Sequence, residues 1–175
     1  MITPTVLTQL KAFARQDGLL LGLYWTTSFI LVVSLPQSII GSLLALATPV
    51  FLGWRLCCFR DFALDGIISF RRGFAYCIYT TFYASLLFAL IQFIYFRFID
   101  HGRFFSLLSE NMDLISQVYV QNGMSVSNLK EAMAELQSLP PVEWTFMIMM
   151  QNILIGFLLG LPVAAACTRK GVVKK

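Results

Sequence analysis

The chain has 175 residues, of which 58% are hydrophobic and only 13% charged, and its formal net charge is +4. An average soluble domain has about 25% charged residues, so a soluble fold of this composition would lack the polar surface needed to cover itself. The composition, with a mean hydropathy of +0.74, therefore excludes an ordinary soluble protein. It predicts a single integral membrane domain over residues 1–175.

The first apolar stretch predicts two membrane spans. No Asp, Glu, Lys or Arg occurs from Gly18 to Trp54, and this run is too long for one helical span of about 17–25 residues. Pro36 and the polar residues after it divide the run, because proline cannot continue a helix. We therefore expect spans near 17–35 and 38–58. The first is expected to be an uncleaved anchor, since no small-residue cleavage site follows it.

Two later apolar stretches predict a third span near 73–98, rich in aromatic residues, and a fourth near 144–168. Backbone groups inside a bilayer must be hydrogen-bonded within a helix or a closed barrel, and the alternating pattern of a barrel is absent. The predicted fold is therefore an all-α polytopic membrane protein with four transmembrane helices. Pro49 and Pro162 are expected to kink the second and fourth helices.

The segment 100–142 predicts an external amphipathic helical hairpin. Apolar residues recur at intervals of three or four on both sides of a turn signal at Asn122-Gly123, which is typical of helices with one apolar face. Two interpretations remain open. The hairpin either covers its own bundle or the outer leaflet, or it presents its apolar face to a partner protein.

Lysine and arginine are distributed unevenly between the two sides of the membrane. Ten of the thirteen lie before the first span, between the second and third, or after the fourth, and four spans place these three groups on one side. The positive-inside rule makes that side cytoplasmic, with both termini inside and segment 100–142 outside. The basic excess thus reflects topology and contact with anionic lipid headgroups, without nucleic acid as a partner. The ten residues are Lys11, Arg15, Arg55, Arg60, Arg71, Arg72, Arg169, Lys170, Lys174 and Lys175.

Residues suited to catalysis are scarce. His101 is the only histidine, no carboxylate is expected inside the spans, and no nucleophile or phosphate-binding motif occurs. Four cysteines fall near the predicted cytoplasmic ends of the spans, where they could either form a zinc or iron–sulfur site or have buried apolar roles. None has the CxxC spacing of a metal site, so we expect neither an enzyme nor a cofactor. The cysteines are Cys57, Cys58, Cys77 and Cys167.

Polar and small residues inside the spans are candidate sites of another kind. Gln92, Gln151 and Asn152 are explained by interhelical hydrogen bonds, worth about 0.6 kcal/mol each on average, or by a polar pathway through the bundle. Gly156 and Gly160 have the spacing that lets another helix approach closely. That helix belongs either to the same chain or to a second copy in a homo-oligomer.

The stretch Phe59–Cys77 connects the second and third spans and contains Arg60, Arg71 and Arg72. Gly66 suits a tight turn within it. The stretch is either a plain cytoplasmic connector, whose arginines reach lipid headgroups, or a surface that binds headgroups or a partner protein.

The segments DGIISFRRGF, FIYFRFID and GFLLGLPVAAACTRK, with a hairpin rich in Met, Gln and Glu before the last, resemble a bacterial family of small four-span proteins, domain of unknown function family 4199. The resemblance implies a bacterial inner-membrane location, no known activity and no catalytic residues. It also suggests a peripheral enzyme of envelope synthesis, such as a glycosyltransferase, as a partner. We therefore expect a non-enzymatic partner-binding or scaffolding protein. The alternative is an oligomeric transporter of a small molecule or lipid.

Overall fold

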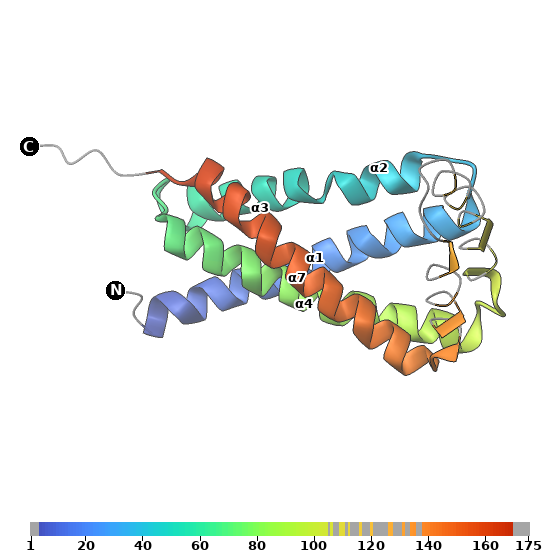
Figure 1. Ribbon diagram of the computed structural model, residues 1–175. Helices are drawn as coiled ribbons and strands as arrows, with labels where there is room; N and C mark the ends of the chain where they lie inside the picture. The colour runs from blue at the N-terminus through green and yellow to red at the C-terminus, as the bar shows by residue number, and fades with distance from the viewer. Residues whose placement is uncertain are drawn as a thin grey trace, which may run out of the picture.

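The computed structural model describes residues 4–104 and 138–169 continuously, and between them residues 106, 109–110, 112, 116, 120, 126–127, 131 and 134–135. The described residues form an all-α fold (Figure 1). Its helices are α1 (Pro4–Ser34), α2 (Ile40–Leu46), α3 (Thr48–Ala63), α4 (Phe70–Phe98) and α7 (Pro141–Cys167). The start of α1 and the end of α7 lie at the same end of the bundle (Figure 1).

Three of the described helices, α1 from Leu7 onward, α4 and α7, are each long and apolar enough to cross a membrane. The short α2 and the longer α3 meet this standard only together, as a pair bent by 47°. The described chain thus has three such helices, or four if the bent pair forms one span. This confirms the predicted fold class of an all-α chain with several apolar helices.

Helix α1 begins well before the predicted start of the first span. The charged residues Lys11, Arg15 and Asp17 all belong to this helix. Charged side chains disfavour insertion of a segment into lipid, but they do not prevent that segment from being helical. The rise from Asp17 to Ser34 is about 26 Å, close to the thickness of about 30 Å of a bilayer's hydrocarbon core. The turns before Asp17 therefore make the helix longer than the predicted span.

The predicted second helix is divided at Ala47. Pro49 lies in the first turn of α3, where its missing N–H would have no helical partner in any case. Thr48 Oγ1 donates instead to the carbonyl of Ala45 at 2.7 Å. The proline thus produces a break with a bend between two helices. Pro162, by contrast, lies inside the continuous helix α7.

Helix α7 packs closely on α4 through its two spaced glycines. A Cβ atom at Gly156 would lie 2.6 Å from Thr81 Cβ, and one at Gly160 would lie 3.2 Å from Cys77 Cβ. These two glycines therefore bring α7 close to α4 of the same chain. Helix α1 approaches α4 in the same way, since a Cβ at Gly18 would lie 2.6 Å from Tyr83 Cβ.

The predicted external hairpin falls mostly outside the described residues, and it stays a prediction. Its beginning is visible after α4, where the Asp100 carboxylate accepts hydrogen bonds from the backbone N–H of Phe104 at 2.8 Å and of Gly102 at 3.1 Å. The ring of Phe104 lies 6.1 Å from that of Trp144 in the first turn of α7. These contacts bring the two ends of the segment together beside α4 and α7.

Candidate functional site

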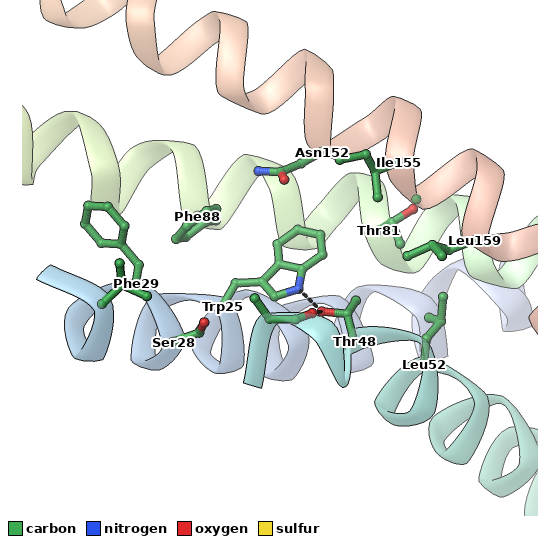
Figure 2. A pocket seen from close by; sticks show the side chains of 13 residues that line it. Trp25, Ser28, Phe29, Thr48, Leu52, Thr81, Phe88, Asn152, Ile155 and Leu159 are labelled. Carbon is green, nitrogen blue, oxygen red and sulfur yellow. Dashed lines mark hydrogen bonds between the residues drawn. The ribbon is translucent and has the colours of Figure 1, made fainter. Parts of the chain in front are cut away.

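A pocket of about 320 Å³ lies among α1, the α2–α3 bend, α4 and α7. Figure 2 shows side chains from α1, α3, α4 and α7 converging on it. The volume is within the lower part of the range of about 300–1,000 Å³ that small-molecule sites occupy. The pocket therefore has the size of a ligand site.

The pocket is bordered by two local features of the backbone. Ala45 and Thr48 line it from the two sides of the α2–α3 break, and Gly156 lines it where α7 lies against Thr81 of α4. The Trp25 indole N–H donates to Thr48 Oγ1 at 3.1 Å (Figure 2). This hydrogen bond connects α1 to the start of α3 and holds the indole ring as part of the wall.

The lining changes from exposed to buried residues. Val32, Ala45 and Ile155 lie on the exposed surface of their helices, whereas Leu52 and Phe88 are buried. The pocket thus leads from the apolar outer surface of the bundle into its interior. In a membrane that outer surface faces lipid, so the pocket is accessible to a hydrocarbon chain.

One polar group on the wall lacks an internal partner. The Asn152 Nδ2 atom is buried and has no hydrogen-bond acceptor among the described residues, and Figure 2 shows the side chain extending from α7 on the pocket side. Ser28, by contrast, donates its hydroxyl to the carbonyl of Gly41 at 2.7 Å. Asn152 therefore leaves one hydrogen-bond donor for a ligand.

An ion pair with a buried carboxylate lies outside the pocket in the same bundle. The Arg55 Nε atom donates to Asp17 Oδ1 at 2.8 Å, and the Tyr76 hydroxyl donates to the other carboxylate oxygen. Asp17 is 2% exposed. Asp17 is thus a buried carboxylate within the helical bundle, and the prediction that the membrane spans contain no carboxylate stays a prediction. Asp17 stands directly before the charge-free run, and only the approach of Arg55 and Tyr76 makes its burial possible.

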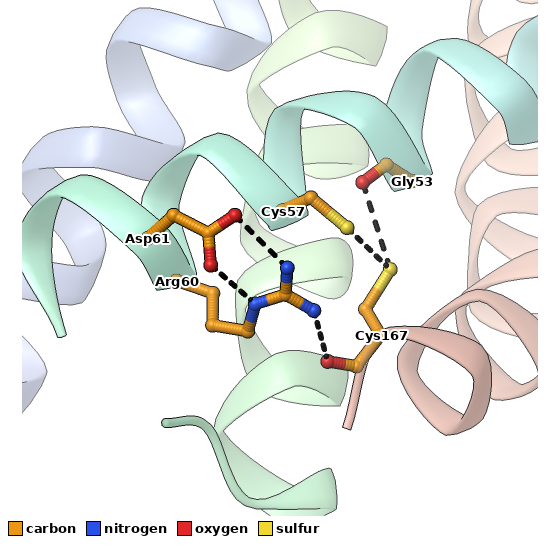
Figure 3. A network of polar contacts seen from close by, with 5 residues as sticks. All are labelled: Gly53, Cys57, Arg60, Asp61 and Cys167. Carbon is orange, nitrogen blue, oxygen red and sulfur yellow. Dashed lines mark hydrogen bonds and ion pairs between the residues drawn. The ribbon is translucent and has the colours of Figure 1, made fainter. Parts of the chain in front are cut away.

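A third polar cluster joins the ends of α3 and α7 (Figure 3). The guanidinium of Arg60 forms a bidentate ion pair with Asp61, at 2.7 and 2.9 Å, and donates to the carbonyl of Cys167 at 3.1 Å. The sulfur atoms of Cys57 and Cys167 lie 3.3 Å apart. Nowhere in the described part of the chain do three His, Cys, Asp or Glu side chains gather in a way that would hold a metal ion.

Residues 16–169 match the family described as protein of unknown function (DUF4199). The chain belongs to this family. The match confirms the resemblance that the connector, the third helix and the last span indicate. No curated protein and no solved structure matches the chain, so the chemistry of the site is argued from its own residues.

The three predicted binding arginines differ in their surroundings. Arg60 is engaged by Asp61 and Cys167, and Arg72 donates to Gln9 Oε1 at 3.0 Å while covering the ring of Phe59 at 5.7 Å. Arg71 is exposed. Among the described residues it has no ion pair. It is therefore the one of the three arginines whose guanidinium is left for an external partner.

The predicted intramembrane polar residues are also separated by the structure. Asn152 lines the pocket, Gln92 is buried within α4 away from it, and Gln151 is exposed on α7. These three amides do not form a continuous polar pathway in the described structure. The wall residue Trp25 and the Asp17 carboxylate were missed from the sequence, because their partners come from other helices.

Proposed function

We propose that this protein is a non-enzymatic protein of the bacterial inner membrane that binds the hydrocarbon chain of a membrane lipid in the pocket among α1, α3, α4 and α7. The observation that carries the proposal is a pocket that leads from the exposed apolar face at Val32 and Ile155 to the buried side chains of Leu52 and Phe88. Apolar walls with a few polar groups are typical of sites for apolar ligands.

The charge distribution supports the proposed location and orientation. The end of the bundle where α1 begins and α7 ends also contains the connector with Arg60, Arg71 and Arg72, and the positive-inside rule favours the cytoplasm for this end. With the termini inside, segment 100–142 lies on the outer side of the membrane. Lipids of both leaflets then surround the outer surface of the helices.

A partner-binding role at the cytoplasmic end is a second proposal, favoured by the exposed side chain of Arg71. Its guanidinium can form bidentate contacts with an acidic group of a peripheral enzyme of envelope synthesis. The glycosyltransferase partner, oligomer formation and net transport of a lipid or small molecule stay predictions.

Photocrosslinking tests the lipid-binding proposal. The full chain is reconstituted in nanodiscs that contain phosphatidylethanolamine with a diazirine in the acyl chain, irradiated, digested and mapped by mass spectrometry. We expect adducts on the buried lining residues Leu52 and Phe88, which bulk lipid does not reach. Adducts confined to exposed residues such as Leu158 would contradict the proposal.

A pair of matched substitutions makes the test specific. Ala45→Phe places a ring at the exposed rim of the pocket, whereas Ala166→Phe places the same ring on an exposed position of α7 outside it. The rim variant should lose the interior adducts and keep those on the outer surface, and the control should keep both. Conversion of the labelled lipid to a new product in the nanodiscs would contradict the non-enzymatic part.

A further inference from the structure

The thiols of Cys57 and Cys167 form the most distinctive side-chain pair outside the pocket. Cys57 lies in α3, Cys167 is the last residue of α7, and the Cys57 thiol donates to the Cys167 sulfur at 3.3 Å across 110 positions of sequence. Figure 3 shows the two sulfur atoms directed toward each other. A disulfide has an S–S distance of about 2.05 Å, so a small approach of the two side chains joins them.

The backbone around Cys167 holds this arrangement. Immediately after α7, Arg169 pairs with Ile68 in an antiparallel bridge, with N···O distances of 3.2 and 3.1 Å. The Cys167 thiol also donates to the carbonyl of Gly53 at 3.6 Å. The backbone bridge holds the end of α7 against the connector, and the hydrogen bond from the Arg60 guanidinium to the Cys167 carbonyl holds it against α3. Neither contact involves the two sulfur atoms.

The two thiols differ in their access to an oxidant. Cys57 is partly exposed, whereas Cys167 is buried, and the guanidinium of Arg60 lies beside both (Figure 3). An oxidant in the aqueous phase therefore meets Cys57 first, and Cys167 is the thiol placed to resolve the product.

We propose that Cys57 and Cys167 form a reversible disulfide when a peroxide reaches the cytoplasmic end of the bundle. The Cys57 thiolate attacks a peroxide oxygen, the O–O bond breaks, and an alcohol or water leaves while Cys57 becomes a sulfenic acid. The Cys167 sulfur then attacks the Cys57 sulfur and releases water. Two thiols and one peroxide thus give one disulfide, one alcohol or water, and one water.

The redox state of the compartment determines whether Cys57 and Cys167 rest as two thiols or as a disulfide. In the reducing cytoplasm the pair stays a dithiol, and a cellular thiol returns the disulfide to this state by exchange. The bond joins α3 to α7, and both helices line the pocket. Formation of the bond is nevertheless independent of lipid binding, so the two proposals stand or fail separately.

Thiol counting in membranes tests the proposal. Membranes that contain the full chain are treated with hydrogen peroxide, denatured and labelled with a polyethylene-glycol maleimide, which shifts the band once for each free thiol. The untreated chain should show all four cysteines, and the oxidised chain two, with recovery of four after dithiothreitol. Four labels after peroxide, or two in untreated membranes trapped with alkylating agent, would overturn the proposal.

Single substitutions identify the pair. Cys57→Ser should leave three labels with and without peroxide, whereas Cys58→Ser and Cys77→Ser should go from three labels to one. Cys167→Ser has no resolving thiol, so peroxide should convert Cys57 to a sulfenic acid and lower the count from three labels to two. A smaller number of labels after peroxide in the Cys57→Ser variant would show that other thiols pair, and it would overturn the assignment. Mass spectrometry of the non-reduced digest should show the peptides of Cys57 and Cys167 joined in the monomer band. A joined pair confined to a dimer band would also overturn it.

Discussion

Arg55 in α3 and Asp17 in α1 form an ion pair inside the bundle, with Arg55 Nε donating to Asp17 Oδ1 at 2.8 Å. The Arg55 side chain is 22% exposed and that of Asp17 only 3%, so the carboxylate depends on its protein partners. Tyr76 from α4 donates to the second carboxylate oxygen. One carboxylate therefore connects three helices, α1, α3 and α4.

Asp17→Asn should destabilise the protein by about 3 kcal/mol, since it leaves a partly buried guanidinium without its counter-charge. SDS titration of the purified protein, followed by circular dichroism, measures the effect. Asp61→Asn is the matched control, because the Asp61 side chain is 48% exposed and the Arg60 guanidinium keeps its hydrogen bond to the Cys167 carbonyl. This change should alter stability by less than about 0.5 kcal/mol. Adding Arg55→Gln to Asp17→Asn should cost less than the sum of the two single changes. Equal effects at Asp17 and Asp61 would contradict the importance of the buried pair.

Tyr76→Phe should cost about 1–2 kcal/mol, because it removes a buried hydrogen bond to a charged acceptor. The ring stacked on Phe59, with centroids 4.8 Å apart, stays in place. Tyr79→Phe in the same helix is the control. Its hydroxyl has no hydrogen bond among the described residues, so this change should be nearly neutral in the same titration. A neutral Tyr76→Phe would show that Arg55 alone satisfies the carboxylate.

Gly156→Ala should destabilise the protein by about 1–3 kcal/mol, since the new methyl group overlaps Thr81 and forces α7 away from α4. At Gly53 the nearest atom to a new Cβ is Val163 Cγ1 at 3.7 Å. Gly53→Ala should therefore be neutral or stabilise α3 by up to about 1 kcal/mol. Thermal unfolding in detergent compares the two variants. Equal melting temperatures would argue against the close packing of α4 and α7.

Residue 124 should be accessible only from outside the cytoplasm. Met124→Cys, in a chain whose four native cysteines are replaced by serine, should react with a membrane-impermeant maleimide added to spheroplasts. Ser69→Cys in the exposed connector is the control and should react only after the membrane is permeabilised. Reaction of residue 124 only from the cytoplasmic side would refute the proposed orientation.

Arg71→Gln should weaken association of the connector with an acidic partner. A single arginine near the surface contributes about 1 kcal/mol of attraction to anionic headgroups, and Arg71→Lys keeps this attraction while losing bidentate geometry. Co-purification from native membranes should therefore lose a protein partner with both variants. If both retain every partner, the connector has no binding role. If Arg71→Lys retains the partner and Arg71→Gln loses it, the connector attracts the partner by charge without a specific bidentate contact.

The sequence by itself determined that this protein is suited to a lipid environment, and it determined the approximate position of its helices. The charge-free runs allow only membrane-compatible structure, Pro36 separates α1 from α2, and the charged residues after Phe96 end the apolar stretch of α4. These conclusions follow from local chemistry, because a lipid environment restricts every residue of a span to apolar side chains and internal backbone hydrogen bonds.

The tertiary structure decided which residues act together. Arg55 reads in the sequence as one more cytoplasmic cation, yet it is the partner of Asp17, 38 positions away. Cys57 and Cys167 lack any metal-binding spacing, and their sulfur atoms meet only because α7 returns against α3. The pocket likewise depends on the bend at Ala47 and on the crossing of α4 and α7. Such contacts depend on helix rotation and crossing, which hydropathy does not encode because most residues of a membrane helix are apolar on every face.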